Sequence, residues 1–290
     1  MKIGLLTTVN EYSVDPASLA RKAESLGFES LWLPDHPVMP VHADTPLPET
    51  PPGEGQIPQV YSHMCDPFVA LAMAAAVTTR LKLGTGVCLV PERNPLLTAN
   101  ELGTLDAFSN GRVLFGIGAG WLKEESEMLG ADFPHRWGQT REYIAVMREL
   151  WTKDEASFEG KYAKFGPVRC NPKPVQKSGP PVLIGSKDKN ALRWVARWGD
   201  GWCPIFLSPA ALKSDLEKLR AECKTAGTAY DRLDITIMKR GLKGDRAAVQ
   251  DGLKQYEDAG AQRFVLLLVA DRFDARSYDS VLERLAALYV

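Results

Sequence analysis

Apolar positions along the chain repeat one arrangement: an amphipathic helix ends near Gly or Asn, and a short apolar strand follows. The strands are nearly continuous apolar runs, which is typical of a parallel sheet covered on both faces. A glycine near a helix C-terminus fits the left-handed cap position. The pattern predicts eight strands, at residues 2–8, 30–34, 81–88, 112–118, 181–185, 201–206, 234–239 and 263–269.

Each predicted strand is followed by a predicted helix. Four helices begin with a capping residue and a proline, at Asp15-Pro16, Asp66-Pro67, Asn94-Pro95 and Ser208-Pro209. Eight such units predict an α/β fold, a (β/α)8 TIM barrel that occupies residues 1–290 as one domain. The alternative is a doubly wound open sheet. It is disfavoured because "GIGAGW" has Trp121 in place of the third glycine of a dinucleotide-binding loop.

Two connections are too long to be simple turns. Residues 37–64, after the second strand, are rich in proline. Since they follow a strand's C-terminal end, we interpret them as a lid or substrate loop, the alternative being a disordered insertion. Residues 154–180, after the fourth strand, contain "SFEGKYAKF", which predicts a hairpin insertion.

Composition narrows the class of function. The chain is 45% apolar and 24% charged with a net charge of -1, which argues against a nucleic-acid partner. It has no apolar run long enough for a transmembrane helix, and its N-terminus reads as a first strand rather than a signal peptide. Five scattered cysteines without a CxxC indicate reduced thiols in a cytoplasmic protein.

In a TIM barrel the functional residues follow the strand ends. Asp35 and His36 follow the second strand, while the other strand ends offer mainly glycines and aromatic residues. A nucleophile with its base is missing there, and four dispersed histidines do not predict a metal site. We therefore expect an organic cofactor to supply the chemistry.

The glycines of the third and fourth strands leave two interpretations open. They allow a flat ligand to approach the backbone, or they fit tight inner layers of the barrel. The turn "IGSKDKN" opens a helix next to several basic residues, which favours phosphate binding at Gly185, Ser186 and Lys187. The alternative there is a solvated lysine-rich loop.

Several stretches together resemble the luciferase-like monooxygenase superfamily, flavin- and deazaflavin-dependent TIM barrels, and most closely its probable F420-dependent oxidoreductases. They are "AESLGFESLWLPDH", "LKLGTGVCLVPERNPLLTANELGTLDAFSNGRVLFGIGAGWLKEESEMLG", "FEGKYAKF", "PKPVQ", "PPVLIGS" and "WVARWGDGW". They span most of residues 1–205. The final third of the chain resembles the family only in its alternation of strands and helices.

The resemblance implies roles for particular positions. His36, preceded by Asp35, would lie near the reactive face of F420, or of FMN as the alternative cofactor. A non-proline cis peptide at Gly86-Val87, next to Thr85, would back the ring. The remaining implied cofactor contacts are Gly118, Ala119 and Gly120 along the ring, and Gly185 and Ser186 at the phosphate. Where the family usually has Gly-Gly-Ser, this turn reads Gly185-Ser186-Lys187.

Hydride transfer between F420 and a small organic substrate is therefore the leading hypothesis. His36 would be the acid or base, since an ordinary histidine pKa of about 6.5 suits proton transfer at neutral pH, and Asp35 would orient it or keep it charged. Trp121 replaces a glutamate that some F420-dependent dehydrogenases carry, with Glu124 and Glu125 one turn later. The predicted substrate wall is Trp32, Tyr61, Trp121, Trp137 and Trp202.

Two alternatives remain: an FMNH2-dependent monooxygenase of the same superfamily, and a catalytically silent barrel that binds flavin. The resemblance also implies a homodimer.

Overall fold

The computed structural model describes residues 1–46, 59–268 and 278–290. Within these ranges eight parallel strands form a ring that closes where β3 pairs with β5. The strands, in ring order, are β3 (Lys82–Thr85), β2 (Ser30–Leu33), β1 (Lys2–Leu6), β11 (Arg263–Leu267), β10 (Asp234–Arg240), β9 (Gly201–Trp202), β8 (Val182–Ile184) and β5 (Val113–Gly118). Short β4 (Cys88–Leu89) pairs with the end of β5. Closure excludes the open sheet and confirms the TIM barrel.

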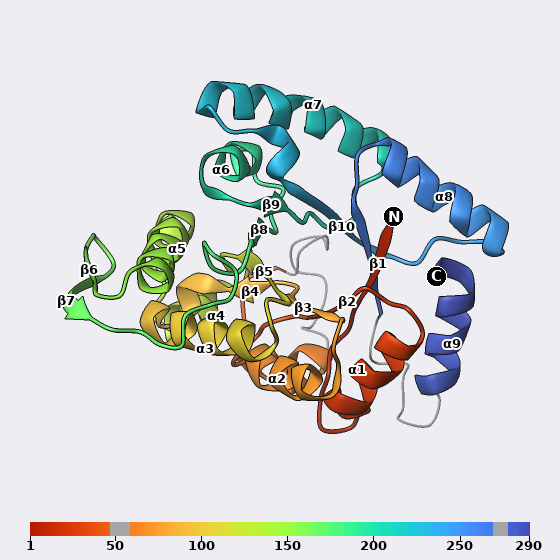
Figure 1. The fold of residues 1–290 in the computed structure, drawn as a ribbon, viewed down its shortest axis with the longest axis horizontal. Helices are drawn as coiled ribbons and strands as arrows, with labels where there is room; N and C mark the ends of the chain where they lie inside the picture. Colours follow the sequence, from red (N-terminus) through yellow and green to blue (C-terminus); the bar gives the residue numbers. More distant parts are fainter. Residues whose placement is uncertain (47–58, 269–277) are drawn as a thin grey trace.

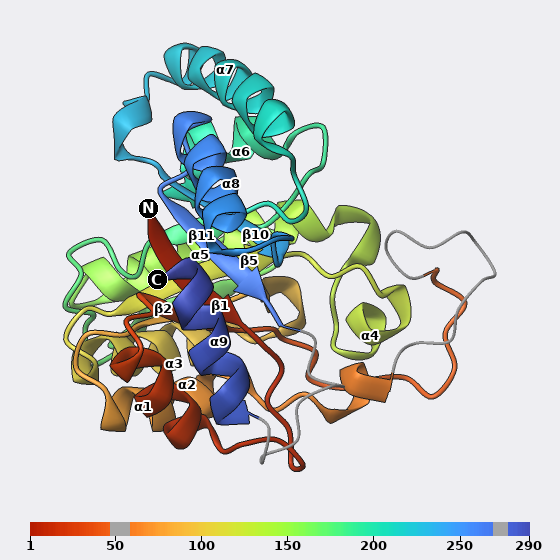
Figure 2. The same ribbon diagram turned by 90° about the vertical axis from the view of Figure 1, so that its right-hand side faces the viewer.

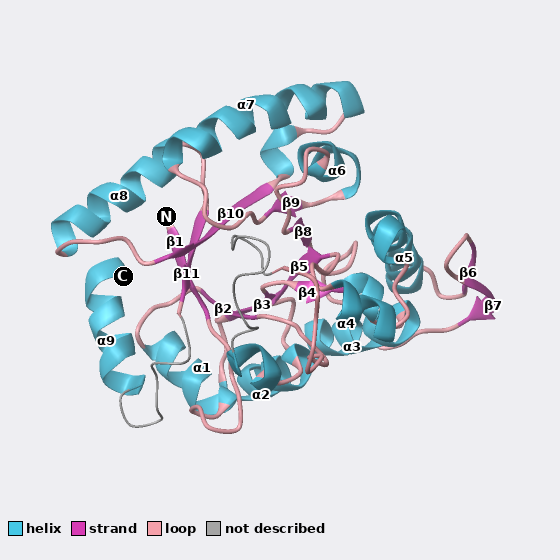
Figure 3. Ribbon diagram, turned by 180° about the vertical axis from the view of Figure 1, so that it is seen from behind, coloured by secondary structure: helices cyan, strands magenta, loops and turns pink. Residues whose placement is uncertain are grey.

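Helices surround this ring (Figures 1 and 3). One follows each barrel strand: α1 (Pro16–Ser25), α2 (Pro67–Val77), α3 (Pro95–Phe108), α5 (Arg136–Thr152), α6 (Ala191–Trp198), α7 (Pro209–Ala226), α8 (Arg246–Asp258) and α9 (Tyr278–Tyr289). The connections also contain α4 (Lys123–Met128) and the single turns η1 (Gln59–His63), η2 (Val90–Glu92), η3 (Phe133–His135) and η4 (Tyr230–Arg232).

The helix starts follow the predicted capping pattern. The side chains of Asp15, Asp66, Asn94 and Ser208 each accept a hydrogen bond from a backbone N–H of the first turn, and a proline follows each of them. These caps satisfy donors that the first turn of a helix leaves without a partner. Each of these helices therefore begins at a fixed residue after its strand.

A small apolar cluster fills the inside of the ring. Its members alternate along the strands with residues packed beneath the helices: Leu6, Trp32, Leu114, Leu183, Cys203, Met238 and Val265. Trp32 is the largest of them and has no exposed surface. A Cβ at Gly84 would overlap its indole ring, and one at Gly116 would lie 3.3 Å from that ring. The barrel accommodates Trp32 by placing glycines opposite it.

The described parts of the two long connections add short elements to the barrel. In the second, β6 (Ala156–Glu159) and β7 (Lys164–Val168) pair as an antiparallel hairpin. In the first, predicted as a lid over 37–64, residues 47–58 lie outside the described ranges. The backbone N–H groups of Asp44 and Thr45 donate to Glu124 of α4. The described part of this connection and α4 therefore lie on the same side of the barrel (Figure 2).

Candidate active site at the carboxyl ends of the strands

Asp35 lies just beyond β2 and is almost completely buried. Arg93, which follows η2, donates hydrogen bonds to both carboxylate oxygens of Asp35. Its Nε lies 2.9 Å from Oδ2 and its Nη2 lies 2.7 Å from Oδ1. The backbone N–H of Leu89 also donates to Oδ2. Asp35 therefore ties the end of β2 to the segment after β3. The expectation that Asp35 orients His36 is wrong, because these groups occupy its carboxylate and another residue binds the imidazole.

That residue is Glu125 on α4. Its Oε2 lies 2.6 Å from Nδ1 of His36, and its side chain is fully buried. On the other side of the ring, the indole N–H of Trp121 donates to Nε2 at 3.3 Å. A carboxylate accepts and an indole N–H donates, so the two contacts assign the proton to Nδ1 and the lone pair to Nε2. From the sequence alone, Glu125 is noted only because it lies one turn after the Trp121 position.

Aromatic rings surround His36. Tyr61 of η1 and Trp121 both meet the imidazole edge to face, with ring centroids 5.2 and 5.9 Å away, and they contact each other at 6.2 Å. The pKa of Tyr61 is raised by burial, against the opposing charge of Arg240. A phenol next to His36 therefore stays protonated at neutral pH.

The other three residues of the predicted substrate wall do not pack against His36. Trp32 is inside the barrel, and Trp202 is 2% exposed with its indole N–H bound to the carbonyl of Ser186. Both are wrong as wall residues, because the barrel interior and the core take up their large apolar surfaces. Trp137 stacks on Trp194 of α6 at 4.4 Å. Only Trp121 and Tyr61 of the predicted wall pack against His36.

The predicted cofactor residues of β3, β5 and β8 come together around Val87. The Gly86–Val87 peptide bond is cis. The Val87 side chain lies against the backbones of Gly118 and Gly185, where a Cβ would be 2.8 and 2.6 Å from its methyl groups. At Gly118 this close packing agrees with the second interpretation of the strand glycines, and Gly185 packs on Val87 in the same way.

Thr85, Ala119 and Gly120 belong to the same rim. The hydroxyl of Thr85 donates to the carbonyl of Gly116, and Ala119 is 4% exposed. Gly120 has a φ of 81°, which glycine adopts without strain. Thr85 and Ala119 thus support the rim from within, and Gly120 turns the chain toward Trp121.

The turn after β8 is more open. Ser186 Oγ accepts from the backbone N–H of Asp188, and Lys187 and Lys189 are exposed ahead of α6. This places two cations beside a helix N-terminus, as the sequence indicates. The structure brings this turn next to Gly118 through Val87.

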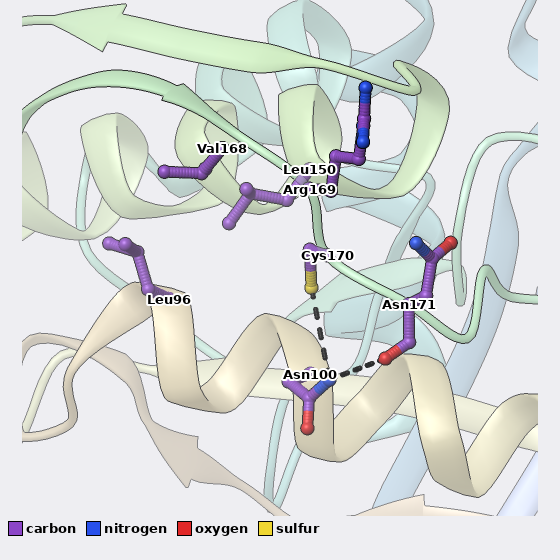
Figure 4. A pocket seen from close by; sticks show the side chains of 7 residues that line it. All are labelled: Leu96, Asn100, Leu150, Val168, Arg169, Cys170 and Asn171. Carbon is purple, nitrogen blue, oxygen red and sulfur yellow. Dashed lines mark hydrogen bonds between the residues drawn. The ribbon is translucent and has the colours of Figure 1, made fainter.

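A separate cavity of about 240 Å³ lies between α3, α5 and the segment after β7 (Figure 4). Asn100 bridges it by donating to the carbonyl of Asn171. Its remaining lining residues are Leu96, Leu150, Val168, Arg169 and Cys170. It contains none of the predicted site residues.

The described residues contain no helix long and apolar enough to cross a bilayer. They also contain no group of three or more His, Cys, Asp or Glu side chains arranged to hold a metal ion.

The fold and these contacts define a TIM barrel with a histidine held at both ring nitrogens at the carboxyl ends of its strands. Residues 15–251 match the model of the luciferase-like monooxygenase family, and the chain belongs to this family of oxidoreductases. An uncharacterized protein of Mycobacterium tuberculosis (strain ATCC 25618 / H37Rv) is 40% identical over 292 residues, which cover 99% of this chain and 98% of the relative.

A more distant relative is an F420-dependent glucose-6-phosphate dehydrogenase of Amycolatopsis mediterranei. It is 29% identical over 237 residues, which cover 80% of this chain and 65% of that protein. Among solved structures, a monooxygenase from Streptomyces bottropensis superposes with a TM-score of 0.80 at 20% identity, covering 99% of this chain and 98% of that one. The latter similarity shows the shared fold.

Proposed function

We propose that the protein transfers a hydride between F420 and a small organic substrate, with His36 as the acid or base. The observation that carries this proposal is the imidazole held at both nitrogens at the carboxyl end of β2, with Nδ1 on Glu125 and Nε2 on Trp121. This is the arrangement expected of a general base whose tautomer is fixed by a carboxylate. The F420-dependent relative supports the choice of cofactor.

The rim residues fit such a cofactor. Val87 is partly exposed between the ends of β5 and β8, which offers an apolar surface for a flat ring. The hydroxyl of Thr8, after β1, is buried and has no partner in the described part of the chain. Gly86 and Val87 would back the ring, and Ser186 with Lys187 would hold the phosphate. Bound there, F420 supplies a carbon that accepts or donates hydride.

Side chains of the protein would accept the substrate's proton and return it. In the oxidising direction the substrate hydroxyl takes the place of the Trp121 N–H at Nε2 of His36 and gives up its proton there. Glu125 then faces an imidazolium, whose charge it stabilises from Nδ1. Tyr61 and Trp121 exclude water from the imidazole. In the reducing direction Nε2 returns the proton to the substrate oxygen.

Cofactor titration and one substitution test this function. Purified protein should bind F420 with micromolar or better affinity, followed by fluorescence. His36→Asn should lower turnover by about 10²- to 10⁴-fold while F420 affinity stays within about threefold. His135→Asn is the matched control, because His135 is exposed and pairs only locally with Asp132. Unchanged turnover in His36→Asn, with active wild type, would overturn the role of His36.

A second candidate is an FMNH2-dependent monooxygenase, favoured by the match to the luciferase-like monooxygenase family. The two proposals differ in ligand and in oxygen use. Tight FMN binding and oxygen consumption without F420 binding would replace the first proposal by the second. Binding of flavin with no turnover of any substrate would leave a silent binding barrel.

We also propose a homodimer. Helix α2 contains no charged residue, yet Val69 and Met73 on its outer side are 65% and 42% exposed. Its neighbour α3 exposes Leu97 and Phe108, 64% and 83% respectively (Figure 1). A helix apolar on all sides is normally covered. We propose that a second copy of the chain covers this apolar surface of α2 and α3.

A further inference from the structure

Glu125 lies on α4 and is fully buried, as is Leu122 just before this helix. Its Oε2 contacts His36, while its Oε1 is buried and has no partner in the described part of the chain. A carboxylate oxygen without a hydrogen bond is costly inside a protein. A donor for Oε1, direct or through water, is therefore required.

Glu92 of η2 is a second buried acid in the same region, 5% exposed. The hydroxyl of Ser126, next to Glu125 on α4, donates to its Oε1 at 2.6 Å, and its Oε2 has no partner in the described residues. The turn at Gly120 packs on this pair, since a Cβ there would lie 2.6 Å from Ser126 Oγ and would overlap Glu92 Oε1. Glu92 and Glu125 thus each carry one buried carboxyl oxygen without a hydrogen-bond partner in the described residues, and they lie close enough for their charges to interact.

The protonation states of the two carboxyl groups allow one to donate a hydrogen bond and the other to accept it. Burial raises the pKa of Glu92 to about 8; the Ser126 hydroxyl and Arg93 lower it, and the negative charges of Glu125 and Asp35 raise it. At neutral pH Glu92 is therefore a neutral carboxyl with an O–H to donate. Glu125, facing the Nδ1–H of His36, is the acceptor.

We propose that Glu125 is the positioning residue of His36, and that Glu92 keeps its proton and donates a hydrogen bond toward the free oxygen of Glu125, directly or through one water. Glu125 fixes the Nδ1–H tautomer and leaves the Nε2 lone pair facing the reaction. The catalytic consequence rests on the proposed function, but the tautomer itself does not. In the described part of the chain, Trp121 and Tyr61 also contact His36, and both remain uncharged.

Nitrogen-15 spectra of histidine-labelled protein without cofactor test this directly. We expect wild type to show His36 protonated at Nδ1, and Glu125→Gln to lose that preference because an amide can either donate or accept. Glu127→Gln is the matched control on the same helix, since Glu127 is exposed and pairs with Lys123. An unchanged His36 tautomer in Glu125→Gln overturns the proposal, whatever the cofactor proves to be.

Steady-state kinetics distinguish the role proposed for Glu92 from the role proposed for Glu125. Glu125→Gln should lower kcat by about 10²- to 10⁴-fold with KM nearly unchanged, and Glu125→Asp should restore part of it. Glu92→Gln imitates the neutral acid at every pH. Wild-type kcat should fall as the pH passes about 8, where Glu92 ionises, and Glu92→Gln should lack that fall. Loss of activity in Glu92→Gln equal to that in Glu125→Gln, in folded protein, overturns the role of Glu92.

Discussion

Arg93 and Asp35 form a two-pronged ion pair under the rim of the barrel, with the Asp35 side chain 1% and the Arg93 side chain 12% exposed. The same Nη2 of Arg93 also reaches Asp66, the capping residue of α2, at 2.8 Å. One guanidinium therefore fixes the end of β2, which bears His36, to the start of the helix that follows the first long connection.

Arg93→Met should destabilise the protein by about 3–5 kcal/mol, because it leaves the Asp35 carboxylate buried and unpaired. Urea denaturation measures this. The double variant Asp35→Asn, Arg93→Met should recover part of the loss, since it removes the buried charge. Arg169→Met is the control: its pair with Glu155 is 72% and 58% exposed and should be worth less than about 1 kcal/mol. Equal losses in Arg93→Met and Arg169→Met would contradict the buried pairing.

Trp121→Phe should lower KM and leave kcat nearly unchanged. Phenylalanine keeps an aromatic ring against Tyr61 but removes the N–H that occupies Nε2 of His36, so the substrate no longer displaces it. A neutral hydrogen bond of about 0.5–1.5 kcal/mol corresponds to a two- to tenfold fall in KM. Steady-state kinetics give both constants. A large fall in kcat would instead mean that the indole N–H holds the imidazole in place during reaction.

Much of the fold was predictable because its signals are local. Apolar runs and capping residues act over a few positions, and they located the eight strands and four helix starts. Asp35 was misread for the same reason. Adjacent residues in an extended segment point in different directions, so proximity to His36 in sequence did not bring their side chains together.

The partners of Asp35 and His36 come from distant segments. Glu125 is 89 residues from His36, and Arg93 is 58 residues from Asp35. The sequence does carry a local indication that Glu125 is buried. It lies three residues after Leu122 and four before Leu129, on the apolar side of a short helix. Which residue it meets there depends on how α4 packs on the barrel, which no local pattern specifies.

Met73→Glu should convert the proposed dimer to a monomer. The substitution places a charge in the middle of the apolar side of α2, where a second copy would have to bury it. Light scattering after size exclusion should give 31.9 kDa for the variant and about twice that for wild type. Val175→Glu changes an equally exposed apolar residue elsewhere and should stay dimeric. A monomeric wild type would reject the proposal.

The ion-pair cluster at the opposite end of the barrel should make stability fall in acid. Arg263 is buried and binds Glu29 through Nε and Nη2, and Asp234 through Nη1. Burial raises the pKa of Glu29, but the hydrogen bonds and charge of Arg263 outweigh this and hold it below its ordinary value of 4.5. The folded state therefore binds fewer protons than the unfolded state in this range, and its stability is lost as the pH falls through the folded pKa.

Glu29→Gln should remove this contribution. Thermal unfolding between pH 7 and pH 3 should show wild type losing its advantage over Glu29→Gln below about pH 4.5, where the unfolded carboxyl takes up a proton. The comparison variant is Glu283→Gln, whose partner Lys22 lies on the surface and whose own side chain is 58% exposed. It should follow wild type at every pH. A wild-type advantage over Glu29→Gln that does not change with pH would show that Arg263 stabilises the cluster without the Glu29 charge.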